Sequence, residues 1–403
     1  MSTDAGTLPL AGVRVVDLST SYAGPTATMY LADLGAQVIK VERPGRGDDA
    51  RAWGPPFVGD TSAWFASANR NKRSVAIDLR SDGGKGVLNC LLSAADVFVE
   101  NMNPAKLESL GLAPDQLRER YPRLIYCALS GFGLDGPDSA LPGYDLVAQA
   151  RSGLMSVTGA AGGTPQRVST ALSDIVTGMS AALAITAAIR RQDRHGVGEL
   201  IDVTLLESDL ALMAPRIAAF LAGEPEPEPS GGTDSVIAVY QPFQTADRPI
   251  VLAIGNDEIW QRCCAELGLD ELVADERFAT NAGRRAHRPY IVHTVQQRLR
   301  EADAETWLSR LASAGVPAAP IQGLSDVLDD RQVRARGSVF ELADAQRAVR
   351  SPWRMASNDT PRTPAPQLGA DTVDVLAAHG YTPAQIHRLL ADSAIQAMDG
   401  EAS

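Results

Sequence analysis

The chain has 403 residues, of which 45% are hydrophobic and 21% are charged. This is the composition of an ordinary globular protein, and the length allows roughly two or three domains. The formal net charge is −12 at pH 7, so the surface as a whole repels nucleic acid and anionic membranes, and we expect neither among the partners.

The four cysteines show no metal-binding or redox spacing. None of Cys90, Cys127, Cys263 and Cys264 forms a C-x-x-C pair, which predicts reduced thiols in a cytoplasmic protein. The opening "MSTDAGTLPL" lacks the basic and apolar segments of a signal peptide. The most apolar run, 175–189, is shorter than the roughly 20 residues of a membrane span, so it predicts a buried helix.

The N-terminal part of the chain alternates apolar runs with helix-like stretches. Stretches such as "YLADLGAQ" and "GGKGVLNCLLSAA" separate runs that are rich in β-branched residues. We predict strands at residues 13–19, 37–42, 74–79, 96–101 and 123–130. A β-α-β order of this kind implies a parallel sheet. The predicted fold class is therefore α/β, with a Rossmann-like large domain.

The stretch "STALSDIVTGMSAALAITAAIRR", residues 169–191, predicts a long helix that begins next to an acidic residue. Asp and Ser are both favoured N-caps, so Asp174 is an ordinary helix start signal. Ser173 could cap the helix as well, which would leave the Asp174 carboxylate available for chemistry. Local sequence favours the cap and leaves both roles for Asp174 open.

A second, smaller domain is predicted from the middle of the chain. Glu and Pro alternate in "GEPEPEPSGG", residues 223–232, which forms neither helix nor central strand and is typical of a linker. Two strand-like runs within 236–254 predict a hairpin, and helices follow. We therefore expect a small α+β domain at 223–324.

The large domain is expected to be built from both ends of the chain. Residues 1–222 would form its first part, and 325–403 would return to it and complete it. The tail "TPAQIHRLLADSA" predicts a helix with Thr382 as N-cap and Pro383 at the first helical position.

Several kinds of site are poorly supported. The turn "TSYAGPTAT" has one glycine where the dinucleotide fingerprint needs three, so Glu42 is an unconvincing ribose-binding acid. The five histidines form neither H-E-x-x-H nor a Cys/His cluster, and we expect no catalytic metal. No G-x-S-x-G hydrolase motif occurs.

Basic residues follow the ends of two predicted strands. Arg43 and Arg46 lie in "VERPGRGDD", and Arg80 comes just after "SVAIDL". The carboxyl ends of parallel strands form the ligand crevice of an open sheet, and guanidinium groups pair well with phosphate. These loops indicate a phosphorylated ligand, with a merely solvated charged surface as the alternative.

Taken together, the motifs resemble the family III CoA-transferases, the group of formyl-CoA and carnitine CoA-transferases. The resemblance is carried in order by "GVRVVDLSTSYAGPTATMYLADLGAQVIKVERPGRGDDAR", "ASANRNKRSVAIDLRSDGGKGVL", "DVFVENMNPAKLESLGL", "GYDLVAQARSGLMSVTG" and "ALSDIVTGM". It continues through "AIGNDEIW", "ERFATNAGRRAHR", "GVPAAPI" and "PQLGADTVDVL". It therefore covers nearly the whole chain.

The resemblance implies an interlocked homodimer with active sites between subunits, coenzyme A as a co-substrate, and no tightly bound cofactor. It also implies that Asp174 is a nucleophile. Residues carried over as CoA contacts are Tyr22, Ala23, Arg43, Ile77, Arg80, Asn101, Met102, Asn103, Gly143 and Tyr144.

Three positions depart from the family pattern. Tyr22 stands where formyl-CoA transferases have a glutamine, so the formyl and oxalate substrate pair is not indicated. The glycine-rich loop at the entry to the small domain is reduced to Gly231 and Gly232. Ser109 replaces an arginine, and Lys106 is the nearby cation that could substitute for it.

The predicted function is transfer of CoA between an acyl-CoA and a free carboxylic acid, through an aspartyl mixed anhydride and an enzyme-CoA thioester. The related α-methylacyl-CoA racemases are an alternative, but their reaction needs a histidine where this chain has Tyr144. A phenol with a pKa near 10 is a poor base at neutral pH. A non-catalytic CoA-binding protein is the third possibility.

Overall fold

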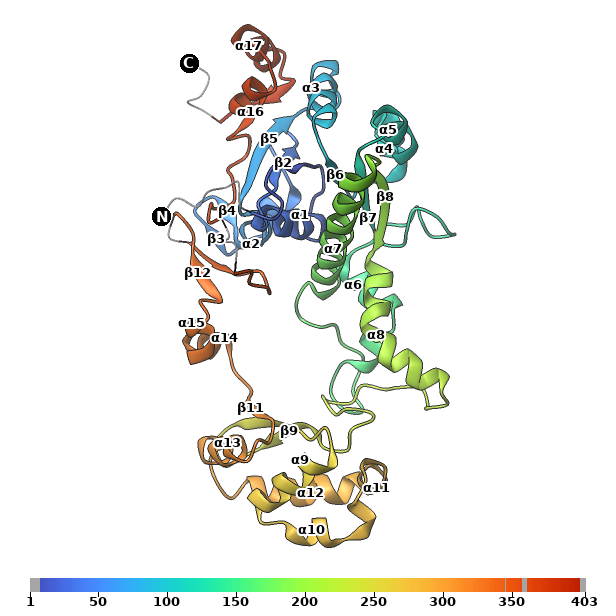
Figure 1. Cartoon of the computed structure of the whole chain (residues 1–403), viewed down its shortest axis with the longest axis vertical. Coiled ribbons are helices and arrows are strands. Elements are labelled where there is room, and N and C mark those ends of the chain that lie inside the picture. The colour runs from blue at the N-terminus through green and yellow to red at the C-terminus, as the bar shows by residue number, and fades with distance from the viewer. Residues whose placement is uncertain (1–7, 345, 357–360, 399–403) are drawn as a thin grey trace. The chain divides into compact units, whose positions relative to one another are not determined.

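The computed structural model describes residues 8–344, 346–356 and 361–398, which fall into two compact units (Figure 1). The first unit comprises Met1–Leu154, Val168–Gly223 and Gly337–Ser403, and the second comprises Met155–Arg167 and Glu224–Arg336. The sequence analysis placed the domain boundaries at 223 and 324 and gave 155–167 to the large domain.

A seven-stranded sheet forms the centre of the first unit, in the order β14-β5-β2-β1-β6-β7-β8. All neighbouring pairs are parallel except β14 with β5. The strands are β1 (Arg14–Asp17), β2 (Gln37–Glu42), β5 (Lys72–Ile77), β6 (Val97–Glu100), β7 (Ile125–Ser130), β8 (Glu199–Thr204) and β14 (Ile395–Gln396). The prediction of an α/β fold with a mainly parallel sheet is confirmed.

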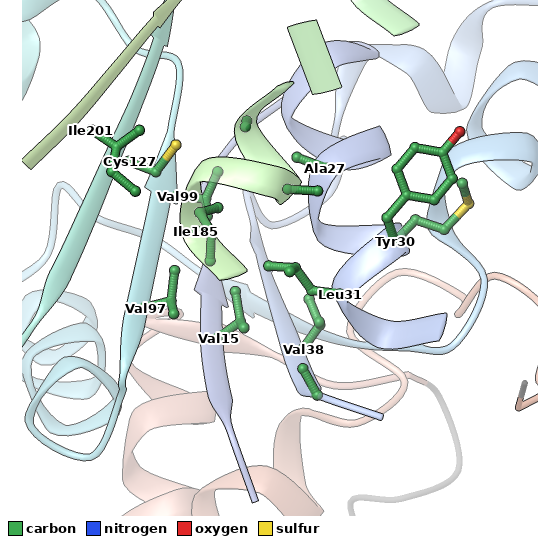
Figure 2. Close-up of a cluster of buried hydrophobic side chains, with 14 of the residues drawn as sticks. Val15, Ala27, Tyr30, Leu31, Val38, Val97, Val99, Cys127, Ile185 and Ile201 are labelled. Atoms are coloured by element: carbon green, nitrogen blue, oxygen red, sulfur yellow. The ribbon is translucent and has the colours of Figure 1, made fainter. Parts of the chain in front are cut away.

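Side chains alternate between the two faces of the sheet along each strand, and helices cover both faces, so both are buried. Val15 packs on one face with helices α1 (Ala23–Asp33) and α7 (Leu172–His195). Figure 2 shows this cluster, with Leu31 of α1 and Ile185 of α7 over the strands. Val16 packs on the opposite face with α3 (Asp82–Ser93) and its neighbours. The apolar runs of the sequence therefore form two core layers.

Helices α1 and α7 approach each other very closely. A Cβ atom on Gly178 would lie 2.7 Å from the carbonyl oxygen of Ala23 and 2.9 Å from Cβ of Thr26, so only glycine fits. By length and composition α7 is apolar enough to cross a membrane, but Ala181 and Ile185 place it in the core of the sheet domain. It is a buried helix, as the sequence predicted.

The other elements of the first unit surround the sheet. They are η2 (Asp49–Ala52), β3 (Phe57–Val58), β4 (Thr61–Ser62), α2 (Ala63–Asn69), α4 (Pro104–Leu110), α5 (Pro114–Arg120), α6 (Asp145–Arg151), α8 (Leu205–Leu221), β12 (Val339–Glu341), β13 (Arg347–Val349), α16 (Thr372–Ala378) and α17 (Pro383–Ala391). Thr382 caps α17 by accepting a hydrogen bond from the Gln385 amide, which confirms the predicted cap.

The second unit contains a three-stranded antiparallel sheet, in the order β11-β10-β9. Its strands are β9 (Tyr240–Gln244), β10 (Pro249–Ala253) and β11 (Ala318–Pro320). Its helices are η3 (Met155–Val157), α9 (Asp257–Leu267), α10 (Asp270–Ala274), η4 (Glu276–Phe278), α11 (Asn281–Ala286), α12 (Arg288–Leu299), α13 (Ala304–Ser313), α14 (Leu324–Asp329) and α15 (Arg331–Ala335). Trp260 and Trp307 are buried in its core.

Two local predictions about this region are confirmed. The runs within 236–254 form the hairpin of β9 and β10. Residues 224–230, which carry the Glu-Pro alternation, form neither helix nor strand.

Candidate active site

A cavity of about 490 Å³ opens at the carboxyl ends of β1, β6 and β7, within the first unit. Strand order reverses around β1, whose two neighbours are β2 and β6, and ligands of open α/β sheets bind at such a switch point. Residues that line the cavity include Thr20, Ser21, Ala23, Trp53, Glu100, Asn101, Met102, Asn103, Gly143, Tyr144, Asp174 and Thr177.

Asp174 lies in the first turn of α7 and lines this cavity. The helix begins at Leu172, with Ala171 at the N-cap position and no side-chain cap. The local preference for Asp174 as the cap is therefore wrong, and so is the suggestion that Ser173 takes that place. Both residues lie inside the helix, because α7 starts earlier than the sequence indicates. No hydrogen bond to the Asp174 carboxylate occurs among the described residues.

The Asp174 carboxyl is less acidic than expected. Burial raises its pKa to about 7, with a further contribution from the negative charges of Asp145 and Asp209. The helix N-terminus favours the ionised form, but burial and like charge outweigh it. An ordinary aspartate is fully ionised at pH 7, whereas part of the Asp174 population is protonated there.

Ser173 connects the start of α7 to two neighbouring helices. Its hydroxyl donates to Oδ2 of Asp209 on α8 over 2.8 Å, and its amide donates to Oδ1 of Asp145 on α6 over 2.8 Å. Asp145 also accepts from Nε2 of Gln149 over 2.8 Å. Sequence analysis missed Asp145 and Asp209. The only signal for Asp209 is an acid within the otherwise apolar "LLESDLALM".

The loop between β1 and α1 is held from both sides. Asn101, which follows β6, accepts from the Thr20 amide over 2.9 Å and donates to the Thr20 carbonyl over 2.8 Å. Asp48 accepts from the Ser21 amide over 3.0 Å. Ser21 has a φ of 69°, a left-handed conformation that costs a non-glycine residue energy and so depends on such support.

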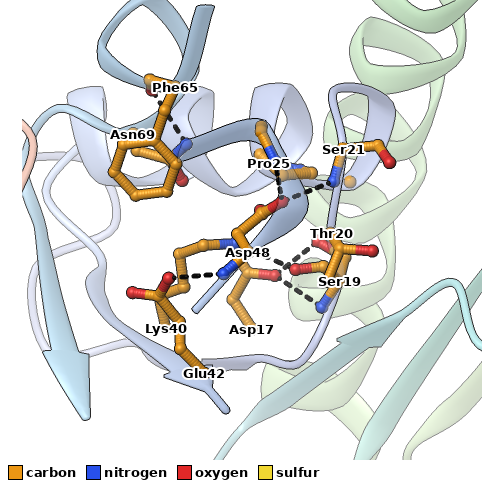
Figure 3. A network of polar contacts seen from close by, with 12 residues as sticks. Asp17, Ser19, Thr20, Ser21, Pro25, Lys40, Glu42, Asp48, Phe65 and Asn69 are labelled. Carbon is orange, nitrogen blue, oxygen red and sulfur yellow. Dashed lines mark hydrogen bonds and ion pairs between the residues drawn. The ribbon is translucent and has the colours of Figure 1, made fainter. Parts of the chain in front are cut away.

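A buried ion network of Asp17, Lys40, Asp48 and Lys72 adjoins this loop. Figure 3 shows three of its members, Asp17, Lys40 and Asp48. The ammonium of Lys40 is 2.9 Å from Asp48, and that of Lys72 is 3.1 Å from Asp17. Lys40 also donates to the Ser19 carbonyl over 2.9 Å. Burial alone would raise the pKa of Asp17, but Lys72 and Lys40 hold it at about 2. The network therefore fixes the loop with opposite charges.

The structure brings together seven of the residues singled out from the sequence. These lining residues are Ala23, Asn101, Met102, Asn103, Gly143, Tyr144 and Asp174. Tyr22 instead lines a second cavity of about 450 Å³, next to Ile175, and its hydroxyl lies 2.9 Å from that of Ser67.

The predicted cationic residues lie outside the cavity. Arg43 is half-exposed and donates to Asp49 over 2.7 Å. The side chain of Arg80 is 90% exposed and pairs with both carboxylate oxygens of Asp78. Lys106 is exposed on α4.

The remaining predicted residues, Ile77, Gly231 and Gly232, also lie outside the cavity. Ile77 is buried in β5, where it pairs with Ile395 of β14. Gly231 and Gly232 lie in the second unit, with φ angles of 65° and 86° that favour glycine. In the part of the chain that the structure describes, no group of three or more His, Cys, Asp or Glu is arranged to hold a metal ion.

Comparisons with known proteins agree with this architecture. The model of CoA-transferase family III matches residues 10–372. The chain is 42% identical over 334 residues to a mouse succinyl-CoA:glutarate CoA-transferase, covering 83% of this chain and 77% of that protein. It is 38% identical over 382 residues to a succinate–glutarate CoA-transferase of Agrobacterium fabrum, covering 92% and 95%.

Solved structures give the same result. A crystal structure of a CAIB/BAIF family protein from Brucella suis superposes with a TM-score of 0.82 at 36% identity, covering 92% of this chain and 99% of that one.

Proposed function

The chain belongs to CoA-transferase family III and transfers CoA between an acyl-CoA and a carboxylic acid, and within this activity we propose that Asp174 carries the acyl group. A carboxylate is a suitable carrier because it can form an anhydride and a thioester in turn. The energy of the incoming thioester is then kept in the enzyme without ATP.

The first half of the reaction frees the donor acid. A carboxylate oxygen of Asp174 attacks the thioester carbonyl carbon, the C–S bond breaks, and CoA leaves as its thiolate. The thiolate then attacks the aspartyl carbonyl carbon of the mixed anhydride. The acyl group leaves as a free carboxylate, and Asp174 remains as a CoA thioester.

The second half repeats these steps in reverse. The acceptor carboxylate attacks the aspartyl thioester carbon and displaces CoA thiolate, which forms a second mixed anhydride. The thiolate attacks the carbonyl carbon of the acceptor's acyl group, and the new acyl-CoA leaves. Asp174 is released as a carboxylate, so no proton, metal or redox partner is consumed.

One observation carries this proposal: the Asp174 carboxylate faces a ligand-sized cavity, and no described residue donates a hydrogen bond that would stabilise its charge. Burial raises the pKa of Asp174 to about 7, and a more basic carboxylate is a better nucleophile once ionised. A structural carboxylate in a helix first turn would instead be expected to accept backbone or side-chain hydrogen bonds.

We propose that the reactive end of acyl-CoA enters this cavity. Lining residues such as Ala23, Asn101 and Gly143 support this placement because they come from loops at the carboxyl ends of the strands. Residues outside the cavity that we also propose as CoA contacts are Tyr22, Arg43, Ile77, Arg80, Lys106, Gly231 and Gly232.

Arg43 and Arg80 suit the phosphate groups of CoA. Each is paired with an aspartate on an exposed surface, where ion pairs contribute only about 0–1 kcal/mol. A phosphate can therefore replace the aspartate at little cost.

We propose short dicarboxylates as substrates, because the two relatives described above are named for succinyl-CoA and glutarate. Incubation with a panel of acyl-CoAs and carboxylic acids, followed by mass spectrometry, tests this directly. Preferred exchange between succinyl-CoA and glutarate is expected. Faster exchange with a monocarboxylate would overturn the substrate class and leave the activity intact.

We also propose that the enzyme works as an interlocked homodimer in the cytoplasm. The four cysteines are unpaired, as thiols are in a reducing compartment. Light scattering on the purified protein is expected to give twice the 42.6 kDa chain mass.

The racemase alternative is disfavoured by Tyr144. It occupies the position where that reaction needs a histidine, and phenols are poor bases at neutral pH. Loss of the α-deuteron from a 2-methylacyl-CoA, without any acceptor acid, would reverse this ranking. A protein that binds CoA but shows no exchange with any pair would favour the non-catalytic alternative.

Substitution of the nucleophile tests the central proposal. Asp174→Ala is expected to lower kcat by about 10⁴-fold or more, while Asp193→Ala, an exposed acid on the same helix, leaves it unchanged. Hydroxylamine added during turnover should convert Asp174 to a hydroxamate. A peptide map that shows the label on another residue would move the nucleophile there.

A further inference from the structure

Three carboxylates from three helices meet at the start of α7. Asp145 comes from α6, Asp174 from α7 and Asp209 from α8. Their charges interact, since Asp145 and Asp209 act on Asp174, and Asp145 acts on Asp209. Like charges in a buried place are unfavourable unless something compensates for them.

Ser173 joins this carboxylate cluster, defined as Asp145, Asp174 and Asp209, into one unit. Its side chain is fully buried, and its hydroxyl donates to Oδ2 of Asp209 over 2.8 Å. Its amide donates to Asp145. The residue directly before Asp174 is therefore tied to both neighbouring helices.

Asp209 is the most deeply buried member of the cluster. Its side chain is completely buried, and Oδ1 has no hydrogen-bond partner among the described residues. No lysine or arginine within those residues forms an ion pair with it. A buried polar atom without a partner is costly to the fold. An asparagine or leucine would serve packing better, so the charge points to a function.

We propose that Asp209 is a positioning residue for the nucleophile, which acts through Ser173 to fix the first turn of α7 and keeps a buried negative charge behind Asp174. The inference rests on the proposed role of Asp174. It answers a difficulty of that role, because a helix N-terminus stabilises a carboxylate and so makes it a weaker nucleophile. The negative charge behind Asp174 opposes that stabilisation.

The groups that face Asp174 are consistent with this arrangement. Asp145 faces it from α6 and Asp209 from α8, and the neutral phenol of Tyr22 faces it from the start of α1. Burial is the first cause that raises the pKa of Asp174, and the two carboxylates add to it. Burial, Asp145 and Asp209 each make the Asp174 carboxylate more basic.

Asp209→Asn separates charge from structure, because asparagine keeps an acceptor for the Ser173 hydroxyl. Without the charge, the acid limb of kcat/KM is expected to move about one pH unit lower. The plateau kcat should fall several-fold, since the ionised Asp174 is less basic. The melting temperature should be unchanged or higher, because a buried charge has been removed.

Ser173→Ala removes the link while the charge remains. We expect kcat to fall about tenfold or more, with KM for acyl-CoA within twofold of wild type. Ser208→Ala is the matched control. This hydroxyl is also buried on α8, but it donates to the Thr204 carbonyl over 2.7 Å and does not contact the cluster. Its turnover should equal that of wild type.

A single-turnover experiment with hydroxylamine distinguishes the two levels of inference. If wild type gives no hydroxamate at Asp174, the proposed function fails. If wild type is labelled and both variants are labelled at the wild-type rate with an unchanged pH profile, the role of Asp209 is wrong while the function stands. The role of Asp209 is supported if Ser173→Ala is labelled more slowly than wild type and the acid limb of the pH profile moves only in Asp209→Asn.

Discussion

Two buried groups of charges lie close to the cavity and use the same low dielectric in opposite ways. The buried ion network of Asp17, Lys40, Asp48 and Lys72 alternates signs, and the pKa of Asp17 is held at about 2. The carboxylate cluster collects one sign, and the pKa of Asp174 rises to about 7. Burial strengthens both kinds of interaction. Charges of opposite sign thus fix a loop, and charges of one sign raise the pKa of a carboxyl that lines the cavity.

The largest expected effect comes from breaking the ion network. Asp17→Ala would leave Lys72 buried without its ion-pair partner, so the free energy of unfolding should fall by about 3–5 kcal/mol. Urea unfolding measures this. Arg80→Ala, which removes an exposed pair with Asp78, should leave the urea midpoint close to that of wild type. Equal losses in the two variants would contradict the comparison.

Removing a charge from the carboxylate cluster should increase the free energy of unfolding, the opposite of the effect expected in the ion network. Asp174→Asn is expected to raise the free energy of unfolding by about 1–2 kcal/mol at pH 8, because it removes a charge from beside two others. The folded-state pKa of about 7 lies above the ordinary 3.8. Wild type should therefore lose stability relative to the variant as pH rises from about 4 to 7. A destabilised variant at pH 8 would show that the charge is compensated.

Asp17 should give the reverse pH dependence. Its folded-state pKa of about 2 lies below the ordinary 3.8, so its contribution is complete above about pH 4 and is lost as pH falls toward 2.

Activity should report the same raised pKa. In the proposed mechanism only ionised Asp174 attacks the thioester, so kcat/KM is expected to fall about tenfold per pH unit below an apparent pKa near 7. Initial rates between pH 5 and pH 9 measure it. A profile that stays flat down to pH 5 would mean that Asp174 titrates as an ordinary carboxyl.

The smallest effect concerns two threonines on α1. Thr26 is buried and its hydroxyl has no partner in the part of the chain that the structure describes, so Thr26→Val should be neutral or stabilise the fold by up to about 1 kcal/mol. Thr28 donates to Asp17 over 2.6 Å, and Thr28→Val should instead cost about 1–3 kcal/mol. Thermal melts of both variants compare them. Similar losses would indicate that Thr26 has a hidden partner.

Local sequence was sufficient for much of the fold, and the full-length resemblance singled out seven of the residues that line the cavity. Apolar runs with β-branched residues predicted the strands of the main sheet, because each strand is buried on both faces. The full-length motif pattern singled out Asp174. The residues around it are absent from that prediction, since Asp145 and Asp209 reach Asp174 only through the packing of α6 and α8 on α7.

The start of α7 and the pKa of Asp174 could not be predicted for the same reason, because both depend on contacts between residues far apart in the sequence. The start of α7 was misjudged because the Ser173 amide bonds to Asp145, 28 positions earlier in the chain, rather than to a local cap. The raised pKa of Asp174 has no signal in the local sequence, because burial and neighbouring charges are properties of the folded chain. Residues 155–167 carry no local signal for the unit that contains them.

The contact at Gly178 has a consequence for protein engineering. Because any larger side chain there would collide with the carbonyl of Ala23 and with Thr26, the helix that bears Asp174 and the helix that follows the cavity loop are matched surfaces. A chimaera that exchanges one of them with a relative should be built with both. If α1 and α7 are exchanged together, the position of Asp174 relative to the cavity is preserved. Substrate specificity can then be redesigned at other residues.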